Sequence, residues 1–189
     1  MAETTEHPAV SVRRTILWAT AVSATLVAAP TLFSWPPRLI WNASASAPVG
    51  LYVMHDARQI EVGDLVAVRP PEALAAFLAG RNYLPLGVPL VKRVLALAGT
   101  EVCRKGAAIV AYDHTYGEAV DRDRLGRELP RWQGCRRLAE GQMFVMNWDA
   151  PDSLDGRYFG PLPVTTITAE LTPLWTDGDR DGRFEWGAP

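Results

Sequence analysis

The longest apolar stretch of the chain lies near its start, at residues 15–35, and contains no charged residue. A helix needs about 20 residues to cross the hydrocarbon core of a membrane, and Trp18 and Trp35 lie where aromatic side chains favour the interface. Arg13 and Arg14 precede this stretch and only Arg38 follows closely, which favours a cytoplasmic N-terminus. The pattern predicts a cytoplasmic segment at 1–14, one transmembrane helix at 15–35, and a body on the periplasmic side of the inner membrane.

A second interpretation of the same stretch is a cleaved signal peptide. Residues 27–29, Val-Ala-Ala, offer the small side chains that are cut after a shorter apolar core. An uncleaved anchor is the preferred interpretation, because the apolar residues continue beyond this point to Trp35.

The pattern changes from residue 51 onward to short runs, alternating or wholly apolar, that are divided by Gly and Pro. Such runs are typical of β-strands. We expect strands at 51–54, 64–68, 88–97, 100–103, 107–112, 142–146 and 164–174. One short helix is expected at 71–80, with Pro71 and Glu72 in its first turn and Gly80 at its end. The sequence therefore predicts a mainly β domain at 36–175 and a polar tail at 176–189.

Charge and length narrow the classes of partner. The 189 residues suffice for one domain and an appendage, and 19 basic against 21 acidic residues give a net charge of -2. The arginines are scattered and form no basic patch, so we expect no nucleic-acid partner.

The two cysteines, Cys103 and Cys135, lack the neighbouring His or Cys residues of a structural zinc site. They are either a disulfide or two buried thiols, and export to an oxidising compartment favours the disulfide. The residues between them are mostly polar, which predicts a solvated insert at about 103–135, pinned at its base. The tail contains half of a calcium loop at 177–182, but Ala188 stands where the bidentate Glu is needed, so no metal is expected.

Candidate chemistry begins with Ser46, in a turn-rich passage at 41–52 shaped by Pro48 and Gly50. Taken alone, this passage is typical of a linker.

A serine nucleophile needs a base, but His55 and His114 lie among turn residues and charges, which favours surface positions. Lys92 instead interrupts the apolar run 88–97, where burial would lower its pKa from about 10.4 and allow a neutral amine to act as general base. An edge-strand or snorkelling lysine is the alternative.

A third polar element, at 147–160, follows the expected strand 142–146. By itself it is typical of an Asx-rich loop with a surface Asp-Arg pair. It follows the Ser46 passage and the Lys92 run along the chain, and the three elements in this order suggest a site and not a surface loop.

The three elements together resemble the Ser-Lys signal peptidase family. The resemblance rests on Ser46-Ala47-Pro48, on Lys92-Arg93-Val94, on Asn147 followed by Ser153-Leu154-Asp155-Gly156-Arg157, and on the Gly63-Asp64 strand. The spacing Asn-x-Ser-x-Ser-x-Pro-x-Gly-x-Tyr at 42–52 is similar to the TraF-type peptidases of conjugative transfer systems. Those peptidases mature pilin precursors and, in some systems, join the pilin ends into a ring. The resemblance implies a signal-peptidase-like β domain.

The same resemblance implies a role for each site residue. Ser46 would be the nucleophile and Lys92 the general base, while Ser44 would help the Ser46 backbone N–H to hold the oxyanion. Ser153 would orient the lysine amine, and Asp155 with Arg157 would form a supporting ion pair. A direct role of Asp155 stays open, and no cofactor is implied.

The implied partners are a membrane-inserted pilin or leader-peptide precursor, the inner membrane, and other components of a transfer system. Two alternatives stay open. One is a general type I signal peptidase that removes leader peptides from exported proteins, and the other is a non-catalytic assembly factor that retains the peptidase fold.

Overall fold

The structure, a computed structural model, describes residues 12–32 and 36–187. The chain forms two compact units, residues 1–37 and 38–189. The first unit contains the helix α1 (Val12–Leu32), and the second contains all the strands.

Helix α1 begins before the stretch predicted as a membrane anchor and overlaps it over residues 15–32, but the prediction of a membrane span is not supported. Among the described residues, no helix combines the length and the apolar character that a membrane crossing requires. Residues 33–35 of the predicted anchor lie outside the described residues.

The main sheet of the second unit has eight strands among the described residues, all paired antiparallel, in the order β1-β2-β11-β3-β4-β9-β10 with β12 beside β11. The strands are β1 (Leu39–Asn42), β2 (Val49–His55), β3 (Leu65–Val68), β4 (Leu90–Leu97), β9 (Gln142–Val145), β10 (Leu162–Pro163), β11 (Ile167–Asp177) and β12 (Glu185–Trp186). The 3₁₀ turn η1 (Val164–Thr166) leads into β11. The predicted mainly β fold is confirmed.

The sequence of strand β3 is a continuous apolar run because both faces of the strand are covered. All four of its residues are buried. Val66 and Val68 pack with Leu78 of the helix α2 (Glu72–Gly80), whereas Leu65 and Ala67 pack in a second cluster on the other face. A strand that is covered on both faces has no polar positions to alternate with.

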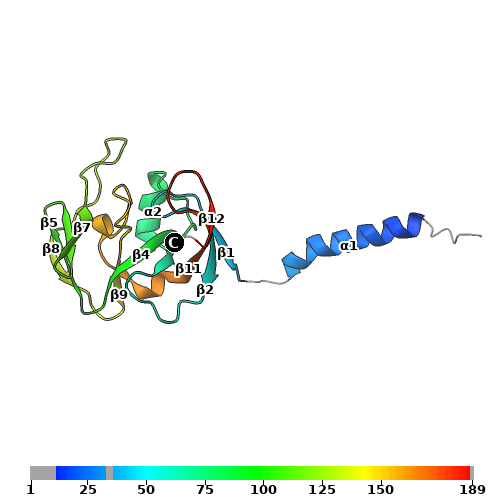
Figure 1. Cartoon of the computed structure of the whole chain (residues 1–189), viewed down its shortest axis with the longest axis horizontal. Helices are drawn as coiled ribbons and strands as arrows, with labels where there is room; N and C mark the ends of the chain where they lie inside the picture. The colour runs from blue at the N-terminus through cyan, green and yellow to red at the C-terminus, as the bar shows by residue number, and fades with distance from the viewer. Residues whose placement is uncertain (1–11, 33–35, 188–189) are drawn as a thin grey trace, which may run out of the picture. The chain divides into compact units, whose positions relative to one another are not determined.

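The cysteine-bounded insert differs from its prediction as a solvated excursion. It carries most of a second antiparallel sheet, which lies at the opposite end of the unit from β1, β2 and β12 (Figure 1). This sheet has the order β7-β6-β5-β8 and consists of β5 (Glu101–Lys105), β6 (Ala108–Ala111), β7 (His114–Glu118) and β8 (Gly134–Arg137). Ile109 and Trp132 are buried and share a core cluster with Phe144 of β9. The few apolar residues of the insert therefore give it a packed face, which the polar majority of its sequence concealed.

The predicted disulfide between the two cysteines is confirmed. Cys103 and Cys135 are directly opposite each other on β5 and β8, and their sulfurs are bonded. The tail is also more ordered than its polar sequence predicted, because β11 runs to Asp177 and β12 pairs with it. Trp186 stays exposed, with its ring 6.2 Å from that of Trp175.

Candidate active site

The loop that carries Ser46 joins β1 to β2, and Asn42 at its start fixes its shape. The side chain of Asn42 is buried, and its Oδ1 accepts a hydrogen bond of 3.1 Å from the backbone N–H of Ser44. Its Nδ2 donates to backbone carbonyls of the loop, those of Ser44 (2.9 Å), Ala47 (3.2 Å) and Pro48 (3.0 Å). One carboxamide thus supplies the hydrogen bonds that this tight loop cannot make to a neighbouring strand.

Two further residues of the 42–52 spacing hold the exit of the loop. The hydroxyl of Tyr52 donates a 2.6 Å hydrogen bond to the carbonyl of Pro48, and burial raises the pKa of Tyr52 to about 12 although Arg93 opposes this. Gly50 has a φ of +151°, and a Cβ at this position would lie 2.3 Å from the carbonyl oxygen of Trp175 on β11. Only glycine allows β2 and β11 to approach this closely.

Lys92 lies on β4, and its amine meets two serine hydroxyls that are distant in sequence. Its Nζ lies 3.1 Å from Oγ of Ser46 and 2.9 Å from Oγ of Ser153. Lys92 is buried and Ser46 is half-buried. The alternative of an edge-strand lysine with a solvated amine is excluded, because Lys92 is 3% exposed and its amine contacts two hydroxyls.

The environment of Lys92 makes its amine easier to deprotonate than that of an exposed lysine. Burial lowers the pKa of Lys92 from 10.5 to about 8, while Asp155 raises it and Arg157 lowers it. Removing an ammonium from water is costly, so the amine releases its proton at lower pH than an exposed lysine does. A fraction of the molecules then carries a neutral amine near neutral pH, positioned to accept the Ser46 proton.

Ser44 lies beside the nucleophile position. Its Oγ is 3.0 Å from Oγ of Ser46 and accepts a long hydrogen bond, 3.4 Å, from the Ser46 backbone N–H. The Ser44 hydroxyl and the Ser46 backbone N–H therefore contact each other beside the Ser46 hydroxyl, the two groups that the family resemblance assigns to the oxyanion.

Asp155 and Arg157 form a buried ion pair, so the alternative of a surface pair is excluded. Arg157 donates from Nε to Oδ1 of Asp155 at 2.9 Å and from Nη2 to Oδ2 at 2.8 Å, with both side chains at most 1% exposed. Asp155 also caps the short helix α3 (Gly156–Phe159). The guanidinium donates further to backbone carbonyls of the preceding loop, those of Asn147, Ala150, Pro151 and Ser153. The ion pair thereby holds the loop that presents Ser153 to Lys92.

The structure places all the predicted site residues of these elements together, and it adds two that sequence reasoning gave no role. Asn42 and Asn147 are both buried asparagines, at 5% and 4% exposure. Each directly follows the apolar residues of a strand, and a polar side chain at that position was the available signal. His55 and His114 are exposed, as predicted.

Metal binding has little support in the described residues. Glu101, Cys103 and Cys135 form the one cluster of potential ligands there, but the two sulfurs are bonded to each other. In the tail, the carboxylate of Asp177 accepts hydrogen bonds from the backbone N–H groups of Asp181 and Gly182, which closes a turn.

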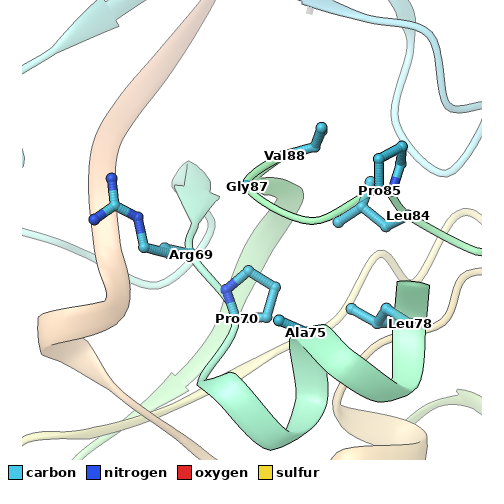
Figure 2. A pocket seen from close by; sticks show the side chains of 8 residues that line it. All are labelled: Arg69, Pro70, Ala75, Leu78, Leu84, Pro85, Gly87 and Val88. Atoms are coloured by element: carbon cyan, nitrogen blue, oxygen red, sulfur yellow. The ribbon is translucent and has the colours of Figure 1, made fainter. Parts of the chain in front are cut away.

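A cavity of about 190 Å³ lies between α2 and the loop before β4, away from the Ser46 hydroxyl. Figure 2 shows the side chains of α2 on one side and those of the loop on the other. The lining residues are Arg69, Pro70, Ala75, Leu78, Leu84, Pro85, Gly87 and Val88. Neither Ser46 nor Lys92 is among them, so this cavity is separate from the contact between the two side chains.

Known proteins of two kinds resemble this chain, signal peptidases and conjugal transfer proteins. The family model for signal peptidase, peptidase S26, matches residues 12–175. A plasmid transfer protein TraF of Escherichia coli is 31% identical over 145 residues, covering 71% of this chain and 81% of that protein. A conjugal transfer protein TraF of Agrobacterium tumefaciens (strain 15955) is 30% identical over 179 residues, covering 87% of this chain and 97% of that protein. A signal peptidase I from Enterococcus faecalis V583 is 18% identical with a TM-score of 0.37, covering 61% of this chain and 98% of that one, which is too distant to support an argument.

Proposed function

Because this chain belongs to the peptidase S26 family of signal peptidases, as a TraF-type member, we propose that it is a serine endopeptidase with a Ser46–Lys92 dyad. The observation that carries the proposal is the 3.1 Å contact between the buried Lys92 amine and the Ser46 hydroxyl. A lysine whose pKa is lowered to about 8 by burial suits a general base.

The reaction follows from these contacts. Ser46 attacks the substrate carbonyl while neutral Lys92 accepts the hydroxyl proton, and Ser44 with the Ser46 N–H stabilises the developing oxyanion. The resulting Lys92 ammonium then donates its proton to the leaving amine, which leaves an acyl-enzyme on Ser46. Water, deprotonated by Lys92, completes hydrolysis.

The proposed substrate is a pilin precursor of a conjugative transfer system. Support comes from the relatives, which are named plasmid or conjugal transfer proteins. If an amine of the pilin itself attacks the acyl-enzyme in place of water, the same site joins the pilin ends into a ring.

The proposed location of the catalytic body is the periplasmic face of the inner membrane. The Cys103–Cys135 disulfide supports an exported body, because disulfides persist in oxidising compartments. Signal peptidases of this family are typically membrane-associated.

Variants of the dyad test this function directly. Ser46→Ala and Lys92→Ala should each leave the pilin precursor unprocessed, while Lys105→Ala, which removes an exposed lysine of β5, should process it normally. A peptide aldehyde or a penem should form an adduct on Ser46, detected by mass spectrometry. Normal processing by either dyad variant would exclude the mechanism, and inactivity of wild type without any adduct would favour a non-catalytic assembly factor.

A second experiment separates pilin processing from general export. Depletion of the protein should cause one precursor to accumulate, with the other exported proteins matured normally. Accumulation of many leader-bearing precursors would instead identify a general signal peptidase.

A further inference from the structure

Asn147 occupies the place where the ladder between β9 and β4 ends. The last backbone hydrogen bond of this pairing runs from the N–H of Met146 to the carbonyl of Arg93, at 2.9 Å. Beyond it the chain turns into the polar loop. The next backbone groups of β4 on this side, the N–H of Arg93 and the carbonyl of Val91, have no strand to pair with.

The carboxamide of Asn147 takes the place of the missing strand. Its Oδ1 accepts a 2.8 Å hydrogen bond from the N–H of Arg93, and its Nδ2 donates a 3.1 Å hydrogen bond to the carbonyl of Val91. An amide side chain presents a donor and an acceptor in the same relative geometry as a peptide group. It therefore fixes the backbone of β4 on both sides of Lys92.

The remaining hydrogen of this carboxamide reaches the nucleophile loop. Nδ2 of Asn147 also donates a 2.6 Å hydrogen bond to the backbone carbonyl of Ser46, a residue 101 positions away in sequence. One planar group thus joins the residue that carries the hydroxyl to the strand that carries the amine.

The backbone of Asn147 is itself held by the buried ion pair. Its N–H donates to Oδ2 of Asp155 at 3.1 Å, and its carbonyl accepts from Nη2 of Arg157 at 3.3 Å. The side chain of Asn147 is buried, at 4% exposure. If the carboxamide is removed, water therefore cannot replace its bonds to Arg93, Val91 and Ser46.

We propose that Asn147 is a positioning residue that sets the separation of Ser46 and Lys92 by bonding the Ser46 carbonyl to β4 on both sides of Lys92. The inference rests on the proposed dyad. It differs from the role of Asn42, whose side-chain bonds to Ser44, Ala47 and Pro48 lie within the nucleophile loop and hold its shape.

Asparagine suits position 147 because its carboxamide both accepts and donates hydrogen bonds. An aspartate at this position keeps the acceptor for the Arg93 N–H but loses both donated bonds and places an anionic oxygen against two carbonyl oxygens. An alanine leaves all three backbone groups unpaired.

Kinetics of Asn147→Ala and Asn147→Asp on a pilin-precursor peptide test the inference. Because a displacement of about 1 Å costs about 100-fold in rate, we expect kcat to fall about 100-fold in both variants, with KM changed less than about twofold. The rate of Ser46 acylation by a penem, or of hemiacetal formation with a peptide aldehyde, should fall in parallel. Folded fractions are measured by thermal unfolding, and kcat is expressed per folded molecule.

Met143→Ala is the matched control, since Met143 is a fully buried residue of β9, the strand that precedes Asn147, and packs in the core away from the dyad. It should lower the melting temperature and leave kcat per folded molecule unchanged. A merely structural Asn147 would behave in the same way, so a wild-type kcat in either folded Asn147 variant overturns the inference. Failure of both variants to fold also counts against it, because that is the result of a structural role.

Ser46→Ala, assayed in parallel, separates this inference from the proposed function. If Ser46→Ala is inactive while Asn147→Ala has a wild-type kcat, only the positioning role is wrong. If Ser46→Ala processes the peptide, the dyad itself is wrong.

Discussion

Lys92 and Ser153, 61 residues apart in sequence, are joined by a hydrogen bond of 2.9 Å inside the protein. The contact directs the lysine amine toward Ser46, whose Oγ lies 3.1 Å from the same Nζ. Because the amine is buried, its protonation state controls both the proposed reaction and the stability of the fold.

The first prediction concerns the pH dependence of activity. The pKa of Lys92 is lowered to about 8, mainly by burial, and only the neutral amine can accept the Ser46 proton. We expect kcat/KM for a precursor peptide to rise with pH through a midpoint of about 8. Lys105→Ala should keep this midpoint, and a profile that is flat between about pH 6 and 10 would rule out a lysine base.

The second prediction is that Lys92→Met is inactive but more stable. Between about pH 8 and 10.5 the unfolded chain binds more protons at Lys92 than the folded chain does, so wild-type stability rises with pH across this window. Below it the full cost of the buried charge is present, and the lowered pKa corresponds to about 3 kcal/mol.

Urea unfolding at two pH values measures this gain. The variant should exceed wild type by about 3 kcal/mol at pH 7 and by much less near pH 10.5, because the wild-type cost has then disappeared. A gain that is independent of pH would mean that packing of the methionine, and not removal of the charge, causes it.

The third prediction concerns Asp155→Asn. This change leaves the guanidinium of Arg157 buried without its counter-charge, which should lower the free energy of unfolding by about 3–5 kcal/mol. The Asp155 charge also raises the pKa of Lys92, so its removal should move the midpoint of the activity profile below that of wild type. Asp152→Asn is the control, since Asp152 pairs with Arg124 at the surface and should change stability by less than about 1 kcal/mol. A midpoint displaced upward would contradict the electrostatic role.

The fourth prediction compares two glycines with positive φ. Gly50→Ala places a Cβ 2.3 Å from the backbone of β11, and it should destabilise the protein by about 3 kcal/mol or more. Gly63→Ala, at φ +102° with nothing within 4 Å, meets only the backbone strain, and should cost about 1 kcal/mol. Thermal unfolding of the two variants measures the difference, and equal losses would mean that the β2–β11 approach is not the cause.

The fifth prediction concerns the disulfide. Cys103 and Cys135 are separated by 32 positions, and closing a loop of this length stabilises the folded state by about 3–4 kcal/mol in the chain-entropy model. The double variant Cys103→Ser, Cys135→Ser should lose that amount in urea unfolding. Wild type treated with a reductant should match it, whereas no difference between reduced and oxidised protein would indicate that the insert is held by its packed face alone.

The buried strands of the main sheet, such as β3 and β4, were predictable from the sequence because their burial is encoded locally. The expected strands 64–68 and 88–97 correspond to β3 and β4, and the expected helix 71–80 to α2. Strand β1 was missed within a passage that resembles a linker, and β7 and β8 were missed because their residues are largely exposed. Short strands without a buried face have no apolar period to detect.

The site was predictable only as a set of residues in order. Ser46, Lys92 and Ser153 were identified by their resemblance to a family pattern, which carries no distances. Asn42 and Asn147 had no predicted role, because an asparagine beside a turn is common and its hydrogen-bond partners are set by the packing of other strands.

The sequence by itself determined the segments that form most of the buried strands, which residue types are available for chemistry, and that one lysine lies in an apolar run. Only the tertiary structure decided that Lys92 is buried against two serine hydroxyls, that Asp155 and Arg157 are an internal ion pair, and that the insert has a core. The physical reason is that local patterns depend on neighbours along the chain. The pKa of Lys92 and the bonds of Asn147 depend on groups brought together from about 50 to 100 positions away.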